Sequence, residues 1–157
     1  MKFQFAVLVL SITCITCTKQ QTDHTSARPS AIEGTWKLVS GMLVEKGDTT
    51  MTDYTTERSM IKIINTSHFA FLNHDLHKGK DSAALFVAGG GTYTLNGDQY
   101  TENLEYCSAR DWEGNTFHFT VTISGDSLVQ KGIEKIEELG IERLNIETYV
   151  RLDNNLK

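Results

Sequence analysis

From Gly34 onward, apolar and polar residues alternate along most of the chain, a pattern typical of β-strands with one buried face. The clearest run is Thr116–Ile123, where aromatic or aliphatic residues alternate with threonine and histidine. Residues Tyr100–Tyr106 and Leu144–Arg151 show the same period of two. Further strands are predicted at Trp36–Val44, Ser59–Asn65, His68–Asn73, Leu85–Ala88, Gly91–Leu95 and Ser127–Lys131.

The breaks between these runs are short and carry turn residues, of which Asn96-Gly97 is the strongest hairpin signal. Sequential strands joined by hairpin-length breaks form an antiparallel meander, and closing the sheet removes its unpaired edges. We therefore predict an all-β fold, an up-and-down antiparallel barrel of about 8–10 strands; a two-sheet sandwich is the alternative. Gly89-Gly90-Gly91 favours a bulge or a close approach of strands.

Helical signal is scarce, and at most one short helix is predicted. Ile133, Ile136 and Leu139 fit a short amphipathic turn ending at Gly140, but the same stretch could extend a hairpin. Leu76–Ser82 is a polar connection.

The first residues are of a different kind. Lys2 precedes an apolar run, Phe3–Thr13, which is shorter than the roughly 20 residues that span a bilayer and indicates a secretory signal peptide. A cysteine followed by a polar stretch resembles the lipobox of bacterial lipoproteins, which implies diacylation of that cysteine. Cys17 is favoured over Cys14, because Ile15 would still belong to the apolar core; free secretion is the alternative.

These features predict a lipoprotein signal peptide (residues 1–17), a flexible tether (18–31), one barrel domain (32–153) and a short tail (154–157). The expected location is the cell envelope, lipid-anchored in the periplasm or at the outer membrane.

A formal net charge of −5 offers no basic surface for nucleic acid. After processing, Cys107 would be the only cysteine, so no intramolecular disulfide is expected.

Ile32-Glu33-Gly34-Thr35-Trp36 resembles the Gly-x-Trp opening of lipocalin-like domains. The resemblance continues through Gly89–Leu95, Asp98–Glu102 and Glu147–Arg151, and it is to a group of secreted lipocalin-like proteins of the Bacteroidetes, many of them lipoproteins. It implies a calycin-type barrel that binds a ligand rather than performing chemistry. It also implies that Trp36 closes one end of the barrel beneath a late arginine. Arg151 fits that role, and Arg143 is the competing partner.

The alternation predicts a group of polar residues inside the barrel, where they would hold the polar head of an apolar ligand. The candidate ligand-binding residues are Tyr93, Glu102, Tyr106, Glu147, Tyr149 and Arg151. The alternative is that they only satisfy one another as a buried network, since buried charges must be paired. A small barrel can also be filled by its own side chains.

No metal, cofactor or catalytic residue is predicted. His74, His77 and the nearby His68 lack a supporting cysteine or carboxylate cluster, so a metal site there is the weaker interpretation. Glu102 and Glu147 could form a carboxylate pair, but the chain has only two tryptophans with which to line a sugar cleft.

Two functions remain. The first is an envelope lipoprotein whose barrel binds a small apolar or amphipathic molecule. The second is a filled barrel whose loops bind a protein partner. The candidate surfaces are Leu76–Ser82 and the segment Asp111-Trp112-Glu113, with Trp112 as an exposed anchor. Trp112 could instead fold back to cap the barrel, and its burial separates the two.

Overall fold

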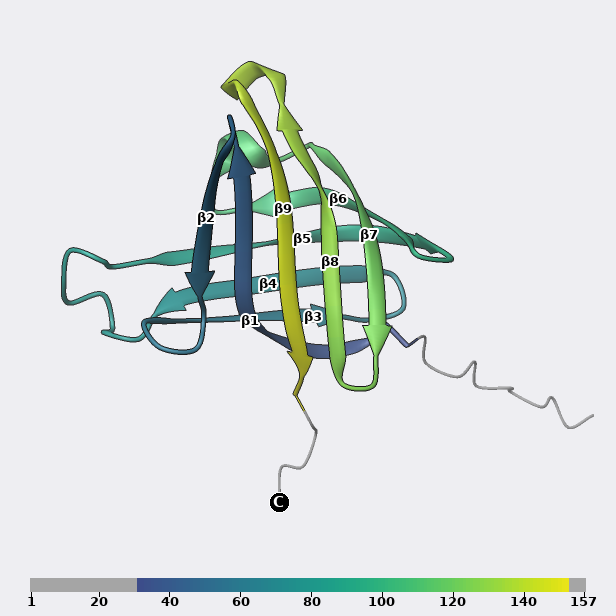
Figure 1. The fold of residues 1–157 in the computed structure, drawn as a ribbon, viewed down its shortest axis with the longest axis horizontal. Helices are drawn as coiled ribbons and strands as arrows, with labels where there is room; N and C mark the ends of the chain where they lie inside the picture. The colour runs from purple at the N-terminus through teal and green to yellow at the C-terminus, as the bar shows by residue number, and fades with distance from the viewer. Residues whose placement is uncertain (1–30, 153–157) are drawn as a thin grey trace, which may run out of the picture.

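The computed structural model describes residues 31–152, which form an antiparallel β-barrel (Figure 1). Eight strands close into the barrel, because the first and last strands along the chain pair with each other. The prediction of an up-and-down barrel is confirmed, and the sandwich alternative is wrong. The predicted signal peptide, most of the tether and the tail lie outside the described residues.

The strands follow one another around the barrel in chain order, apart from a hairpin at its start. Their bounds are β1 Gly34–Glu45, β2 Asp48–Asp53, β3 Arg58–Ile64, β4 His68–Asp75, β5 Phe86–Asn96, β6 Gln99–Cys107, β7 Thr116–Ser124, β8 Ser127–Ile136 and β9 Ile141–Arg151. In Figure 1, β3–β6 lie on one side and cross the direction of β1 and β7–β9 steeply.

The long strand β1 pairs with two different strands along the same edge. Its first part, Gly34–Lys37, pairs with β3, and its second part, Ser40–Glu45, pairs with β2. β2 is a short strand whose residues are nearly all exposed, so it has no hydrophobic alternation and was not predicted.

Glycine-rich Gly89–Gly91 lies inside β5, so the two predicted strands on either side of it are one strand. A Cβ atom on Gly91 would lie 2.0 Å from the carbonyl oxygen of Asn103, and one on Gly90 would lie 2.5 Å from that of Phe69. These short distances show the predicted close approach of strands. The predicted bulge also occurs here, since the register of β5 against β6 slips by one residue at Glu105.

The predicted amphipathic turn extends a hairpin instead of forming a helix. β8 continues to Ile136, a single 3₁₀ turn follows (Glu137–Leu139), and Gly140 adopts a left-handed conformation that leads into β9. A second 3₁₀ turn, Arg110–Trp112, joins β6 to β7. Among the described residues, no helix has the length and apolar character to cross a membrane.

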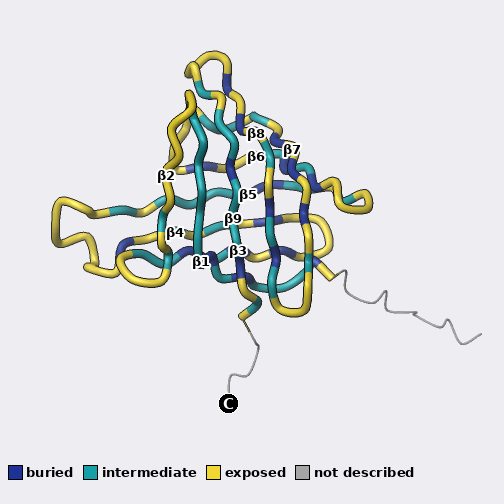
Figure 2. Tube along the Cα trace, viewed as in Figure 1, coloured by how far each residue is buried: buried dark blue, intermediate teal, exposed yellow. Residues whose placement is uncertain are grey.

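Buried residues concentrate on the strands, while the hairpin turns are exposed (Figure 2). The core is a single cluster whose largest fully buried side chains are Trp36, Tyr100, Tyr149, Ile32, Leu38 and Leu128. Most of these lie toward one end of the barrel, which is therefore packed solid.

A cavity at one end of the barrel

Trp36 closes the solid end of the barrel. Its side chain is fully buried, and its indole Nε1 donates a hydrogen bond to the carbonyl oxygen of Ile32 at 2.8 Å. The guanidinium carbon of Arg151 lies 4.0 Å from the centroid of the indole ring, and its Nη1 donates to the Glu33 carbonyl at 2.8 Å. The predicted pairing of Trp36 with Arg151 is thus confirmed, whereas Arg143 lies over Trp112.

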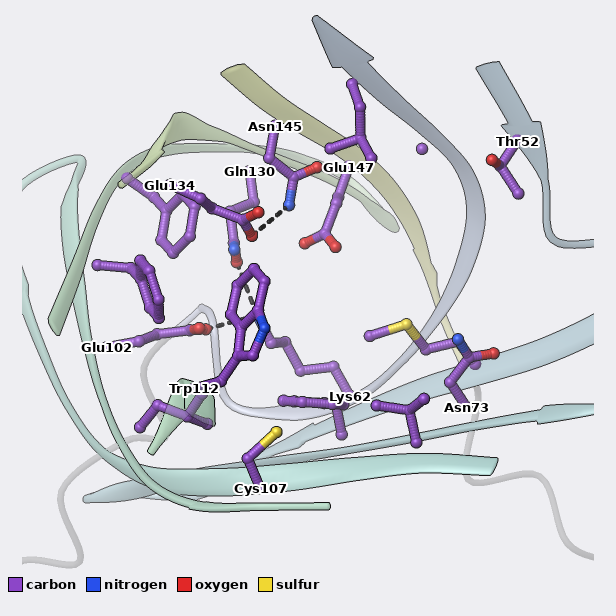
Figure 3. Close-up of a pocket in the computed structure, with 18 of the residues that line it drawn as sticks. Thr52, Lys62, Asn73, Glu102, Cys107, Trp112, Gln130, Glu134, Asn145 and Glu147 are labelled. Carbon is purple, nitrogen blue, oxygen red and sulfur yellow. Dashed lines mark hydrogen bonds and ion pairs between the residues drawn. The ribbon is translucent and has the colours of Figure 1, made fainter. Parts of the chain in front are cut away.

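The other end of the barrel encloses a cavity of about 350 Å³ (Figure 3). Its walls come from strands on all sides of the barrel and combine apolar residues with polar and charged ones; the apolar residues include Met60, Phe71, Leu104, Phe117 and Phe119. Trp112, from the 3₁₀ turn after β6, lies at its mouth and packs against Phe117 with ring centroids 5.8 Å apart. This volume is at the lower end of the range for small-molecule sites, about 300–1,000 Å³.

Lys62 places a cation deep in the barrel. The alternation of β3 directs Met60, Lys62 and Ile64 inward, and Lys62 is only 3% exposed. Its Nζ lies 2.5 Å from Glu102 Oε1 and 2.8 Å from Gln130 Oε1. The aromatic rings of Phe69, Tyr100 and Tyr149 also lie within 5.7 Å of that ammonium group. Burial of a lysine is possible here because its charge is paired and hydrogen-bonded.

Burial raises the pKa of the Glu102 carboxyl, and the ammonium of Lys62 opposes that rise. The desolvation of Tyr149, together with the negative charge of Glu147, holds the pKa of that phenol well above its ordinary value. Both effects follow from the low polarity of the surroundings, which disfavours every additional negative charge in the barrel.

A second polar cluster lies nearer the mouth. Glu134 accepts hydrogen bonds from Arg143 Nε at 2.7 Å and from Asn145 Nδ2 at 2.8 Å. The Arg143 guanidinium also lies over the ring of Trp112, 5.0 Å from its centroid, so the cluster ties β8 and β9 to the residue at the mouth.

Three of the six predicted ligand-binding residues line the cavity: Glu102, Glu147 and Tyr149. Arg151 and Tyr93 do not; Arg151 stacks on Trp36 at the solid end, and the Tyr93 hydroxyl donates to the carbonyl oxygen of Asn65 at 2.7 Å. The predicted inward position of Tyr106 is wrong. The slip at Glu105 reverses the alternation, so Cys107 points inward and Tyr106 is 68% exposed.

Several residues that line the cavity are not among the ligand-binding residues predicted from the sequence, chiefly Lys62, Gln130, Glu134 and Asn145. For Lys62 a signal existed: it falls between Met60 and Ile64 on the apolar face of a predicted strand, where a lysine needs a buried partner. The others gave no comparable signal, because a polar residue on a strand is ordinarily assigned to the solvent face.

His74 is exposed, and His77 Nδ1 lies 2.5 Å from Asp81 Oδ2 in the β4–β5 connection. Within residues 31–152, no group of three or more histidine, cysteine, aspartate or glutamate side chains is arranged to hold a metal ion.

No protein-family model, no curated protein and no solved structure matches this chain. The fold and the cavity together define the protein as a small antiparallel barrel, solid at one end and hollow at the other.

Proposed function

We propose that this protein is a lipocalin-like lipoprotein of the cell envelope that binds a small apolar or amphipathic molecule in its barrel. The observation that carries the proposal is the cavity itself, which is lined by apolar side chains together with polar and charged groups. The polar network of Lys62 is satisfied internally, yet the side chains around it leave the space unfilled.

The alternative, a filled barrel whose loops bind a protein, has two candidate surfaces, and one of them requires an exposed Trp112. That side chain is only partly exposed, packs against Phe117 and lines the cavity. It therefore lies at the cavity rather than on an outer surface, which favours the first function.

The test uses two leucines, one inside the barrel and one outside. Leu43 lines the cavity, and Leu72 lies on the outer face, 41% exposed. Isothermal titration with decanol, whose chain and hydroxyl match the apolar and the polar side chains of the lining, should show saturable binding to the unaltered protein. Leu43→Trp should weaken that binding by about tenfold or more, equivalent to about 1.4 kcal/mol, since the indole occupies the space of the ligand.

Leu72→Trp is the matched control and should leave the affinity unchanged. If decanol does not bind, or if both substitutions weaken binding equally, the cavity is not the ligand site.

The lipid anchor requires a separate experiment. Cys17→Ser should release the protein into the soluble fraction, while Cys14→Ser should leave it membrane-bound, because two acyl chains hold a protein to a membrane where one does not. Metabolic labelling with a palmitate analogue reports the acylation directly. Label that persists in Cys17→Ser and is lost in Cys14→Ser would assign the lipid to Cys14; a protein without label would be freely secreted.

A further inference from the structure

The charges that line the cavity do not balance. Five acidic or basic side chains surround it, two basic and three acidic: Lys62, Arg143, Glu102, Glu134 and Glu147. Lys62 pairs with Glu102 at 2.5 Å, and Arg143 pairs with Glu134 at 2.7 Å. These two pairs account for both cations and leave one carboxylate.

The remaining carboxylate is Glu147. Among the described residues its only hydrogen bond comes from a neutral donor, the hydroxyl of Tyr149, at 2.7 Å, and no Lys, Arg or His nitrogen lies within 4.0 Å. Figure 3 shows the Glu147 side chain directed into the cavity. Its neighbour across the sheet on β1 is Gly41, which places no side chain beside it.

The negative charge of Glu147 acts on the groups around it. It raises the pKa of the Tyr54 and Tyr149 phenols and of the Glu102 carboxyl, in each case in addition to the effect of burial. A cation placed in the cavity would offset this unfavourable charge, and the attraction would be stronger than at the protein surface because burial weakens the screening by water.

The surroundings of Glu147 also suit a cationic group. Tyr54 and Tyr149 line the same cavity, and their rings already lie near cations of the protein: Arg58 is 5.6 Å from the Tyr54 ring centroid, and Lys62 is 5.7 Å from that of Tyr149. The buried Oδ1 of Asn73, another lining residue, has no hydrogen-bond partner among residues 31–152 and can accept a hydrogen from a donor.

We infer that the cavity selects amphipathic molecules whose polar head is a protonated amine, with Glu147 as the counter-ion and the apolar walls holding the hydrocarbon part. This inference rests on the proposed function, because it names the chemical class of the ligand for the same cavity.

The test compares three probes that share a ten-carbon chain: decylammonium, decanol and decanoate. At pH 7 and below their micellar concentrations, isothermal titration should rank the affinities decylammonium, decanol, decanoate. A charge-assisted hydrogen bond is stronger than a neutral one, so the first should bind at least tenfold more tightly than the second. Decanoate should bind most weakly, since the two cations of the cavity already have carboxylate partners.

Three variants assign the preference to one residue. Glu147→Gln keeps the shape and the acceptor for Tyr149, and it should remove the preference for decylammonium over decanol. Glu147→Asp keeps the charge and should retain a preference. Glu142→Gln removes an equal charge from the outer face of the same strand, where Glu142 pairs with Lys135, and should change nothing.

The outcomes separate the two proposals. If none of the three probes binds, the proposed function fails. If decanol binds but decylammonium binds no better, or if the preference survives in Glu147→Gln, only the selection for amines is wrong.

Discussion

Lys62→Met should lower the free energy of unfolding by about 3–5 kcal/mol, the largest loss that we expect from a single substitution in the cavity. Lys62 and Glu102 are both buried and 2.5 Å apart, so the methionine leaves a carboxylate without its cation in apolar surroundings. Urea denaturation measures the change in stability directly.

The same variant should have a characteristic pH dependence. The pKa of Glu102 is already raised from its usual 4.5, and removing Lys62 removes the main effect that opposes the rise. The folded state then binds a proton that the unfolded state releases, so stability falls as the pH rises from 4.5 through the folded-state pKa. We therefore expect Lys62→Met to be more stable at pH 5 than at pH 7.5, by a larger margin than the unaltered protein.

The double variant Lys62→Met/Glu102→Gln is the control. It removes the buried charge, and should recover a large part of the lost stability and the whole of the added pH dependence. A single variant that loses less than about 1 kcal/mol would show that the pair is not buried as a unit, because surface ion pairs contribute only about that much.

Trp36→Ala should cost about 3–5 kcal/mol of stability, the range for truncating a fully buried aromatic side chain. The substitution removes the ring that fills the solid end, the hydrogen bond to Ile32 and the face on which Arg151 stacks. Thermal and urea unfolding followed by circular dichroism measure the loss.

Trp112 provides the comparison, since the protein has only two tryptophans. Trp112 is only partly buried at the cavity mouth, so Trp112→Ala should cost less than half as much stability while altering decanol binding. Equal losses for the two alanine variants would contradict the division of the barrel into a solid and a hollow end.

The barrel could be predicted from the sequence because its signals are local. Period-two alternation and turn residues such as Asn96-Gly97 define successive strands, and an antiparallel meander has few ways to close. Strand β2 was missed because five of its six residues are exposed, which leaves no alternation to detect.

The site was predicted only in part, because its geometry depends on contacts between strands. A single slip at Glu105 turned Tyr106 outward, and such a slip is fixed by the close approach of Gly91 to Asn103 across the pair. Whether a space stays empty also depends on distant residues: the ring of Phe71 covers Gly89, and the ring of Tyr54 lies against Gly41. The alternation of apolar and polar residues along one strand predicts neither the register slip nor the filling of these spaces.

The most direct test of the central claim, that the barrel binds an amphipathic molecule in its hollow end, is crystallographic. The protein would be crystallised with 10-bromodecanol, and the bromine located by its anomalous signal. We predict one bromine position inside the barrel, among Met60, Leu104 and Phe117. An empty barrel, or bromine found only against exposed outer residues such as Leu72 and Phe86, would contradict the account.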